Sequence, residues 1–254
     1  SEISAYIEKV KPCAIINCAA YTAVDKAEVE IDLATKINSC APKAIAKSCQ
    51  HLGIPLIHIS TDYVFSGEKI SHYYEEDNTD PINVYGTTKL EGERHVLESC
   101  DTAIVLRTSW VFSEYGSNFF TTMLKLANSH DSLRVVADQW GRPTYAGTIA
   151  EIIFILLEKI QKNETTAYGL YNICEQERTN WFQFAEEIFT QALTLGTISQ
   201  RPKLTAIPSS DYPTPAKRPL NSELCCSKLE YYLEMELPYW KDSLHKILTN
   251  NTRF

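Results

Sequence analysis

The sequence predicts an α/β fold with a doubly wound, Rossmann-like parallel sheet, and two observations support that fold class. Short apolar runs alternate with longer segments of helical periodicity through the first half of the chain. The strands are expected at residues 13–18, 55–59 and 103–106, and the helices at residues 31–52 and 85–97. Polar segments follow two of these strands, at residues 60–62 and 108–110. Ligands bind outside the carboxyl ends of the strands in such sheets, so the site is expected there.

The second half of the chain has a different pattern. Helices are expected at residues 118–128, 149–162, 181–195 and 240–248, with one short strand at residues 169–174. Five prolines between residues 202 and 219 indicate a loop-rich tract, as expected for a lobe that grips a ligand. We therefore expect a sheet domain over residues 1–145. Residues 146–254 are expected to form mainly a smaller α/β lobe, interleaved with the first domain.

The composition is that of an ordinary globular protein of 254 residues, with 44% hydrophobic and 22% charged residues. The net charge of −8 disfavours nucleic acids and anionic membranes as partners. The longest apolar run, residues 152–157, is too short to span a bilayer. Eight cysteines without any C-x-x-C spacing favour free, buried thiols in a reducing cytoplasm. No metal-ligand spacing is found, so no metal is predicted.

A glycine-rich phosphate-binding turn, with which a Rossmann sheet normally opens, is absent. Only nine glycines occur, and no G-x-G-x-x-G can be written among them. The chain begins with a helix-like stretch over residues 1–11 and continues directly into what has the pattern of a third strand. We therefore expect the chain to be a fragment, or an incompletely represented protein, that lacks the first βαβ strands of the sheet.

Tyr85 and Lys89 form the first candidate for chemistry. They are four residues apart on a predicted helix and so share one face. An ammonium group near a phenol favours the phenolate, which would tune the tyrosine as a general acid and base. Thr61 ends the preceding strand and could bond the same substrate oxygen. Taken singly, a solvated helix face and a capped strand end are the alternatives.

Six stretches extend this pattern over nearly the whole chain. They are residues 17–28 (NCAAYTAVDKAE), 60–67 (STDYVFSG), 85–93 (YGTTKLEGE), 106–111 (LRTSWV), 138–144 (DQWGRPT) and 217–222 (KRPLNS). In these stretches the sequence resembles the extended short-chain dehydrogenase/reductase superfamily, and within it the dTDP-4-dehydrorhamnose reductase family. The missing glycine-rich turn is its one departure from the family.

The resemblance implies reduction of the C4 keto group of dTDP-4-dehydro-L-rhamnose by NADPH or NADH, and it makes residues 1–145 a truncated NAD(P)-binding domain. The implied catalytic residues are Thr61, Tyr85 and Lys89. Cofactor-binding residues would be Ala19, Ala20 and Thr22 together with Tyr85 and Lys89; substrate-binding residues would be Asp62, Tyr63, Trp110, Arg218 and Asn221. A homodimer is compatible with the resemblance.

Two other functions are compatible with parts of this pattern. A regulatory subunit, like the beta subunit of methionine adenosyltransferase, could keep the Tyr and Lys without catalysis, but residues 108–110 and 138–144 match the reductase branch. An epimerase or dehydratase on a related sugar nucleotide is the third possibility, because dehydratases add an acid after the strand-end Thr, where Asp62 stands. Tyr63 and Trp110 favour the reductase.

Cofactor affinity is expected to be poor without the glycine-rich turn. We expect the isolated 254-residue chain to turn over slowly or not at all. The choice between NADPH and NADH stays open, because the residue that reads the ribose 2′ position should follow the missing second strand.

Overall fold

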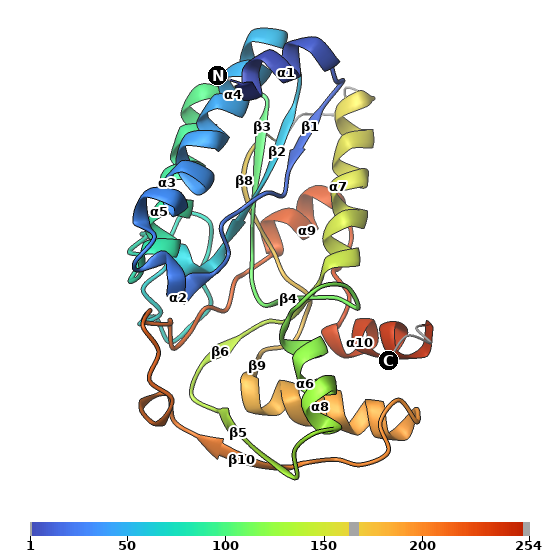
Figure 1. Ribbon diagram of the computed structural model, residues 1–254. Coiled ribbons are helices and arrows are strands. Elements are labelled where there is room, and N and C mark those ends of the chain that lie inside the picture. Colours follow the sequence, from blue (N-terminus) through green and yellow to red (C-terminus); the bar gives the residue numbers. More distant parts are fainter. Residues whose placement is uncertain (1, 163–167, 251–254) are drawn as a thin grey trace.

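The computed structural model describes residues 2–162 and 168–250. Figure 1 shows a sheet flanked by helices in the upper part of the molecule and a smaller lobe below it. The sheet is parallel throughout, in the order β1-β2-β3-β8. Its strands are β1 (Ile15–Asn17), β2 (Leu56–Thr61), β3 (Ala103–Thr108) and β8 (Gly169–Ile173). The predicted strands are therefore confirmed. Two of them, β2 and β3, extend two residues further toward their carboxyl ends than expected.

Helices cover both faces of the sheet, which confirms the doubly wound architecture (Figure 1). The alternation of side chains along β3 shows why. Ala103 and Val105 pack with α4 (Ala41–Leu52) and α5 (Val84–Ser99). Ile104 and Leu106 lie in the opposite core, with α7 (Ala146–Gln161) and α9 (Ser227–Leu233). A strand that is buried on both faces reads as a continuous apolar run, which is the pattern the sequence has there.

The helix expected over residues 31–52 is present without a break, and it contains a π-helical turn. The structure has α3 (Ile31–Thr35), a π-helical turn over Lys36–Cys40, and then α4, which ends at Gly53 in the left-handed conformation (φ 65°). The glycine cap was expected; the π turn was not, because one extra residue per turn leaves no local signature in the sequence. Two further short helices are α1 (Glu2–Val10) and α2 (Val24–Ala27).

The lower lobe is built around three helices and an aromatic core. The helices are α6 (Phe119–Ala127), α8 (Trp181–Thr194) and α10 (Trp240–Asn250), close to their predicted positions. Phe112, Phe120, Phe184, Phe189 and Trp240 are all buried in this core. Its strands pair as β5 (Ser132–Val136) with β10 (Lys203–Ile207), β4 (Val111–Phe112) with β7 (Thr144–Tyr145), and β6 (Trp140–Gly141) with β9 (Thr179–Asn180).

The two parts exchange segments. The chain passes from β7 of the lobe directly into α7, which packs on the sheet, and then into β8 at the sheet edge. Glu175 is buried at this junction. It accepts hydrogen bonds from the Tyr145 N–H (3.2 Å), the Thr148 hydroxyl (2.6 Å) and the Ser243 hydroxyl (2.5 Å). The carboxylate, two residues beyond the end of β8, therefore connects β7, α7 and α10.

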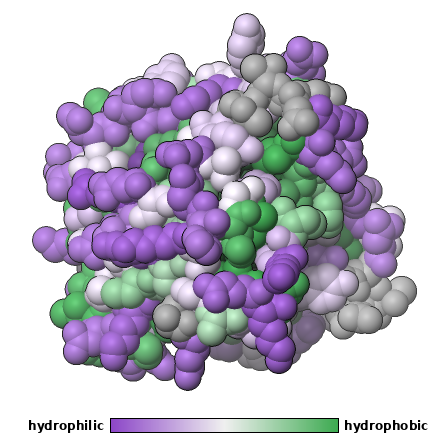
Figure 2. Space-filling model, turned by 90° about the horizontal axis from the view of Figure 1, so that it is seen from above, coloured by the Kyte–Doolittle hydropathy of each residue, from purple (hydrophilic) through white to green (hydrophobic). Residues whose placement is uncertain are grey.

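The face seen from above in Figure 2 carries the amino ends of the strands, and hydrophobic side chains reach the surface there among hydrophilic ones. An apolar groove of about 590 Å³ lies between α1 and β1, with Ile3, Ile7, Val10, Ile15 and Ile16 among its lining residues.

None of the helices in the described part of the chain has the length and apolar character needed to span a bilayer. All eight cysteines are free, but three of them are exposed, so the expected burial is wrong for Cys13, Cys18 and Cys40.

Candidate active site

The carboxyl ends of β1, β2 and β3 open into a cavity of about 620 Å³ between the sheet and the lower lobe. Helices α5, α6 and α7 contribute to its walls, and Trp181 closes it on the side of the lobe. The predicted site residues that line it are Ala20, Thr22, Thr61, Asp62, Tyr63, Tyr85, Lys89 and Trp110. Ala19, Arg218 and Asn221 do not line this cavity.

Thr61 is the last residue of β2 and caps the short 3-10 helix Asp62–Val64. Its Oγ1 accepts a hydrogen bond from the Tyr63 N–H (3.2 Å) and donates one to Asp62 Oδ1 (3.0 Å). Thr61 also lies within hydrogen-bonding reach of the Tyr85 side chain, and this contact favours the charged form of the phenol. The end of the strand thus brings the Thr61 hydroxyl to the predicted helical tyrosine.

Tyr85 and Lys89 lie in the first turns of α5. Asn83 caps this helix by accepting a hydrogen bond from the Gly86 N–H (2.7 Å), so the helix starts at the cavity. The Lys89 side chain is 2% exposed, and its Nζ donates to the Ile59 carbonyl (2.6 Å) in β2. The structure therefore brings the three predicted catalytic residues into one cavity. Their catalytic roles stay predictions.

Burial dominates the pKa values of this cluster. It raises the pKa of Tyr85 to about 12, and the Asp62 charge acts in the same direction. Burial lowers the pKa of Lys89 to about 8, against the opposing effect of Glu93 and Cys18. The helical spacing predicted that the Lys89 ammonium lowers the pKa of Tyr85; in this arrangement that lowering is not seen. A phenol with a raised pKa stays protonated at neutral pH and is poised to donate a proton.

The loop after β1 carries the predicted cofactor-binding residues, and Asn38 holds it in place. Asn38 Oδ1 accepts the Tyr21 N–H (2.8 Å), while its Nδ2 donates to the Tyr21 carbonyl (3.1 Å) and to Thr88 Oγ1 (3.2 Å). The backbone between Ala20 and Thr22 is thereby fixed to α5. Sequence reasoning missed Asn38 because it projects from the unexpected π turn, a feature that is frequent at functional sites.

Trp110 lies at the end of β3, in the left-handed backbone conformation (φ 49°) that non-glycine residues rarely adopt. Its ring stacks on Trp181, with centroids 3.7 Å apart and planes 9° from parallel. A Cβ added at Gly141 would come within 2.6 Å of the Trp110 ring, so the backbone of Gly141 packs directly against that ring. Trp181 is a cavity residue that the sequence placed only at the start of a helix.

Asp62 and Tyr63 follow Thr61 in the same turn. Burial raises the pKa of Asp62 to about 7, although contacts with Ser222 and Thr61 favour its charged form. Its Oδ2 is buried without a hydrogen-bond partner among the described residues. Tyr63 packs edge-on against Tyr85, with ring centroids 5.6 Å apart. Burial raises the pKa of Tyr63 as well, so both phenols are neutral at physiological pH.

A second cavity of about 370 Å³ adjoins the first, because Phe119 and Trp181 line both. Arg218 lines the second cavity, where it pairs with Asp25 of α2 (2.9 Å) and lowers the pKa of that carboxyl. Asn221 lines neither cavity. Its amide donates to the carbonyls of Lys69 (2.7 Å) and Ser71 (3.0 Å), so its contacts hold a loop, and its place toward the nucleotide stays a prediction.

A buried ion pair lies behind the cavity. Arg107 and Glu93 approach to 2.8 Å, and their side chains are 4% and 2% exposed. Arg107 donates to both carboxylate oxygens of Glu93, which also accepts a short bond from the Ser60 hydroxyl. The charged partner of Arg107 in this structure is therefore a carboxylate. Glu93 lies one helical turn beyond Lys89, and its charge opposes the lowering of the Lys89 pKa by burial.

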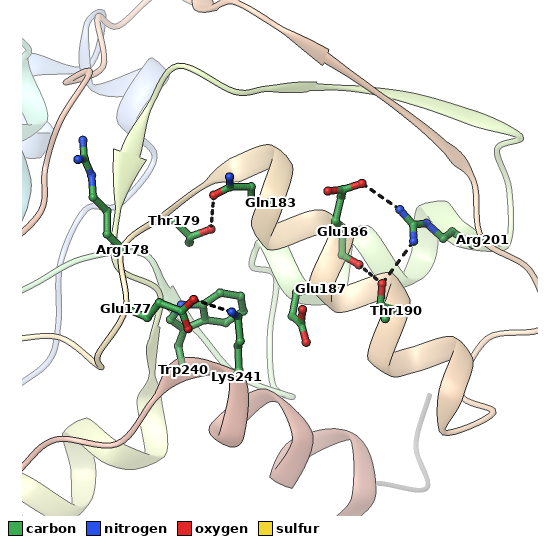
Figure 3. Close-up of a pocket in the computed structure, with 10 residues that line it drawn as sticks. All are labelled: Glu177, Arg178, Thr179, Gln183, Glu186, Glu187, Thr190, Arg201, Trp240 and Lys241. Carbon is green, nitrogen blue, oxygen red and sulfur yellow. Dashed lines mark hydrogen bonds and ion pairs between the residues drawn. The ribbon is translucent and has the colours of Figure 1, made fainter.

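A further pocket in the lower lobe, of about 410 Å³, has a polar lining but contains none of the predicted site residues (Figure 3). Four of its charged side chains are paired with one another: Lys241 with Glu177 (2.5 Å) and Arg201 with Glu186 (3.1 Å). Arg178 pairs with Glu223 (3.6 Å), which does not line the pocket, and Glu187 accepts a hydrogen bond from Gln191 (2.8 Å). Paired surface charges leave little attraction for a ligand. Nor do the described residues bring together three or more His, Cys, Asp or Glu side chains that could hold a metal ion.

A doubly wound parallel sheet whose carboxyl edge gathers a threonine, a tyrosine and a lysine defines a Rossmann-type oxidoreductase of the short-chain dehydrogenase/reductase class. The family model described as the RmlD substrate binding domain matches residues 1–253. The chain belongs to the dTDP-4-dehydrorhamnose reductase family.

Relatives over most of the chain carry that name. The dTDP-4-dehydrorhamnose reductase of Aggregatibacter actinomycetemcomitans is 43% identical over 95% of this chain and 82% of its own length. The enzyme of Escherichia coli strain K12 is 40% identical over 95% of this chain and 81% of its own. Both matches confirm the reductase branch that the six stretches indicated.

Solved structures agree with the fold. The dTDP-4-dehydrorhamnose reductase of Bacillus anthracis, in complex with NADP, superimposes with a TM-score of 0.91 at 34% identity; the match covers 98% of this chain and 85% of that one. The Clostridium acetobutylicum enzyme gives 0.88 at 37% identity, over 97% and 83% of the two chains. The predicted Rossmann-like fold class is thereby confirmed.

Proposed function

We propose that the protein reduces the C4 keto group of dTDP-4-dehydro-L-rhamnose to dTDP-L-rhamnose with NADPH or NADH. One observation supports this above the others: Thr61, Tyr85 and Lys89 meet in a single cavity at the carboxyl edge of the sheet, in a chain of the reductase family. When bound, the dihydronicotinamide would supply the hydride. The protein's own residues would supply the proton and stabilise the charge that develops on the oxygen.

Tyr85 is the proposed proton donor. Its raised pKa keeps the phenol protonated before reaction, as reduction requires. As hydride reaches C4, the carbonyl oxygen becomes an alkoxide, which is far more basic than a phenolate and takes the Tyr85 proton. Thr61, within hydrogen-bonding reach of Tyr85, would donate a hydrogen bond to the same oxygen. The phenolate that remains would be stabilised by the Lys89 ammonium on the same helix face.

The cavity fits a nicotinamide dinucleotide. Ala20 and Thr22 offer small side chains on a loop that Asn38 keeps rigid. Thr108 Oγ1 is buried there without a hydrogen-bond partner among the described residues, so a hydroxyl is available to a ligand. Lys89 uses one ammonium proton on the Ile59 carbonyl and keeps two for ribose hydroxyls. Ala19 would contribute backbone alone, because its side chain is exposed outside the cavity.

The adjoining cavities suit an elongated substrate. The sugar would lie beside Asp62, Tyr63 and the stacked ring of Trp110. The nucleotide would extend into the second cavity past Phe119, toward Arg218. Arg218 is already paired with Asp25, so its guanidinium would contact a phosphate while remaining in that ion pair. Asn221 would contribute to the nucleotide side indirectly, by holding the loop that contains Lys69 and Ser71.

The remaining expectations concern the cell rather than the chemistry. Eight free thiols suit the reducing cytoplasm. The net charge of −8 favours small-molecule partners over nucleic acid and anionic membrane. A homodimer stays a prediction, which sedimentation of the purified protein would test.

The direct test is an assay with the purified protein. Oxidation of NADPH or NADH should depend on dTDP-4-dehydro-L-rhamnose, with dTDP-L-rhamnose appearing in equal amount by NMR. The two cofactors, assayed in parallel, give the preference. UDP-linked keto sugars serve as controls for the nucleotide. Cofactor binding without any turnover of the keto sugar would contradict the proposal.

A further inference from the structure

Thr61 carries a single hydroxyl proton, and the structure shows where it goes. One lone pair of Oγ1 is occupied by the Tyr63 N–H, and the proton is directed at Asp62 Oδ1. In this arrangement the hydroxyl has no second proton to offer. The proposed reduction, however, needs Thr61 to donate to the substrate oxygen. The same proton therefore has three competing acceptors: the carboxyl of Asp62, the phenol oxygen of Tyr85 and the reacting oxygen.

We infer that Asp62 controls the donor direction of Thr61, so that Thr61 can donate to the substrate oxygen only when Asp62 is protonated. An ionised carboxylate is a strong acceptor and would hold the Thr61 proton. A neutral carboxyl is a much weaker acceptor and can itself donate to Thr61 Oγ1, which releases the threonine proton toward the substrate. Asp62 is thus a positioning residue that acts through Thr61, and it ends the reaction in the state in which it began.

The surroundings of Asp62 favour a proton on it. The residue is 3% exposed, and its Oδ2 is buried without a hydrogen-bond partner among the described residues. Hydroxyls of Ser222 and Thr61 and the backbone of Asp62 and Tyr63 favour its charged form, but burial outweighs them. The equally buried Glu175 behaves alike, because its pKa is raised although it accepts three hydrogen bonds. A buried carboxylate is costly to ionise.

The groups that face Asp62 come from several elements, and all are neutral hydrogen-bonding groups or phenols. Thr61 belongs to β2, Tyr63 to the turn that follows, Tyr85 to α5 and Ser222 to the loop before α9. Ser222 and Thr61 favour the charged form of Asp62, but burial outweighs them and places its pKa at about 7. Arg218 and Asp25 act on the neighbouring Tyr63 and are paired with each other.

The sign of the pH effect follows. Asp62 is protonated below its pKa, so the Thr61 donor is present at acid pH and is lost as the pH rises through about 7. Lys89, with a pKa near 8, adds a second loss of activity at higher pH. The two pH transitions can be distinguished, because substitution of Asp62 or Thr61 should affect only the one near pH 7.

The inference rests on the proposed reduction, and kcat against pH tests it in the purified protein. Losing one donor to the reacting oxygen costs on the order of 10²-fold, so wild-type kcat should fall by about that factor across the lower of the two transitions. In Asp62→Asn the amide can donate to Thr61 at every pH, and the lower transition should vanish while the Lys89 transition remains. Thr61→Val should be slow throughout and should also lack the lower transition. Asp62→Ala, which has neither a carboxyl nor an amide in its side chain, should also lack the lower transition.

A readout independent of turnover is the infrared C=O band of a protonated carboxyl in the cofactor-free protein. The wild-type spectrum minus the Asp62→Asn spectrum should contain this band at mildly acid pH and lose it as the pH rises through about 7. The exposed control Asp211→Asn should leave it in place. Wild-type and Asp62→Asn profiles of identical shape, or an Asp62 band absent at mildly acid pH, would overturn the inference. Absence of keto-sugar reduction at every pH would instead defeat the proposed function.

Discussion

Replacing Tyr85 by phenylalanine is expected to lower kcat for the keto-sugar reduction by about 10²- to 10⁴-fold, the contribution typical of a positioned general acid. Tyr85 is half-buried and lines the cavity beside Thr61, where the reacting oxygen is proposed to lie. Substrate and cofactor binding should change little, because the ring that packs on Tyr63 is retained. The measurement is kcat and KM from NADPH oxidation, with thermal unfolding to show that the fold is intact.

Tyr231→Phe is the matched control for that experiment. Tyr231 is 88% exposed on α9, far from the cavity lining, and its loss of a hydroxyl should leave both kinetic constants unchanged. A Tyr85→Phe enzyme with near wild-type kcat would remove Tyr85 as the proton donor. A rise in KM alone would assign it to binding rather than to chemistry.

Glu93→Ala is expected to lower the free energy of unfolding by about 3–5 kcal/mol, the usual cost of removing one partner from a buried ion pair. The substitution would leave the Arg107 guanidinium 4% exposed with only its bond to the Glu75 carbonyl (3.3 Å). Ser60 would lose its acceptor in the same step. Urea denaturation of the variant and the wild type gives the difference directly.

Glu76→Ala provides the surface comparison. Glu76 pairs with Lys228 at 3.4 Å, with side chains 73% and 43% exposed, and such pairs contribute at most about 1 kcal/mol. An equal loss in the two variants would show that burial adds nothing to the Glu93–Arg107 pair. The double variant Glu93→Ala with Arg107→Met should recover part of the loss, because no uncompensated charge remains.

The sheet and the candidate catalytic residues could be predicted from the sequence, because local patterns indicate both. β2 and β3 are buried on both faces, and their short, continuous apolar runs distinguish them by length and composition. Tyr85 and Lys89 share a helix face by spacing, so their proximity follows from helix geometry. The family resemblance then linked Thr61 to them, and the cavity contains all three.

What the sequence did not predict depends on contacts between distant residues or on burial. β5 and β10 form a parallel pair although 66 residues separate Val136 from Lys203, and no local pattern indicates such a pairing. Asn38 reaches the cofactor loop only through a π turn. The pKa of Tyr85 was expected to fall by charge attraction, but desolvation, which needs the folded structure to be seen, raises it.

The direct passage from β7 into α7 has a mechanical consequence. β7 ends at Tyr145 and α7 begins at Ala146, so the crossing lacks the loop residues that usually serve as a hinge. Glu175 ties this crossing to α10, because it accepts hydrogen bonds from Tyr145 and Thr148 of the crossing and one from Ser243 of α10. Rocking of one half against the other would strain the direct junction of β7 with α7 and break buried bonds. We therefore expect ligands to enter and leave by local movements at the cleft rim, with the two halves unfolding together as one cooperative unit.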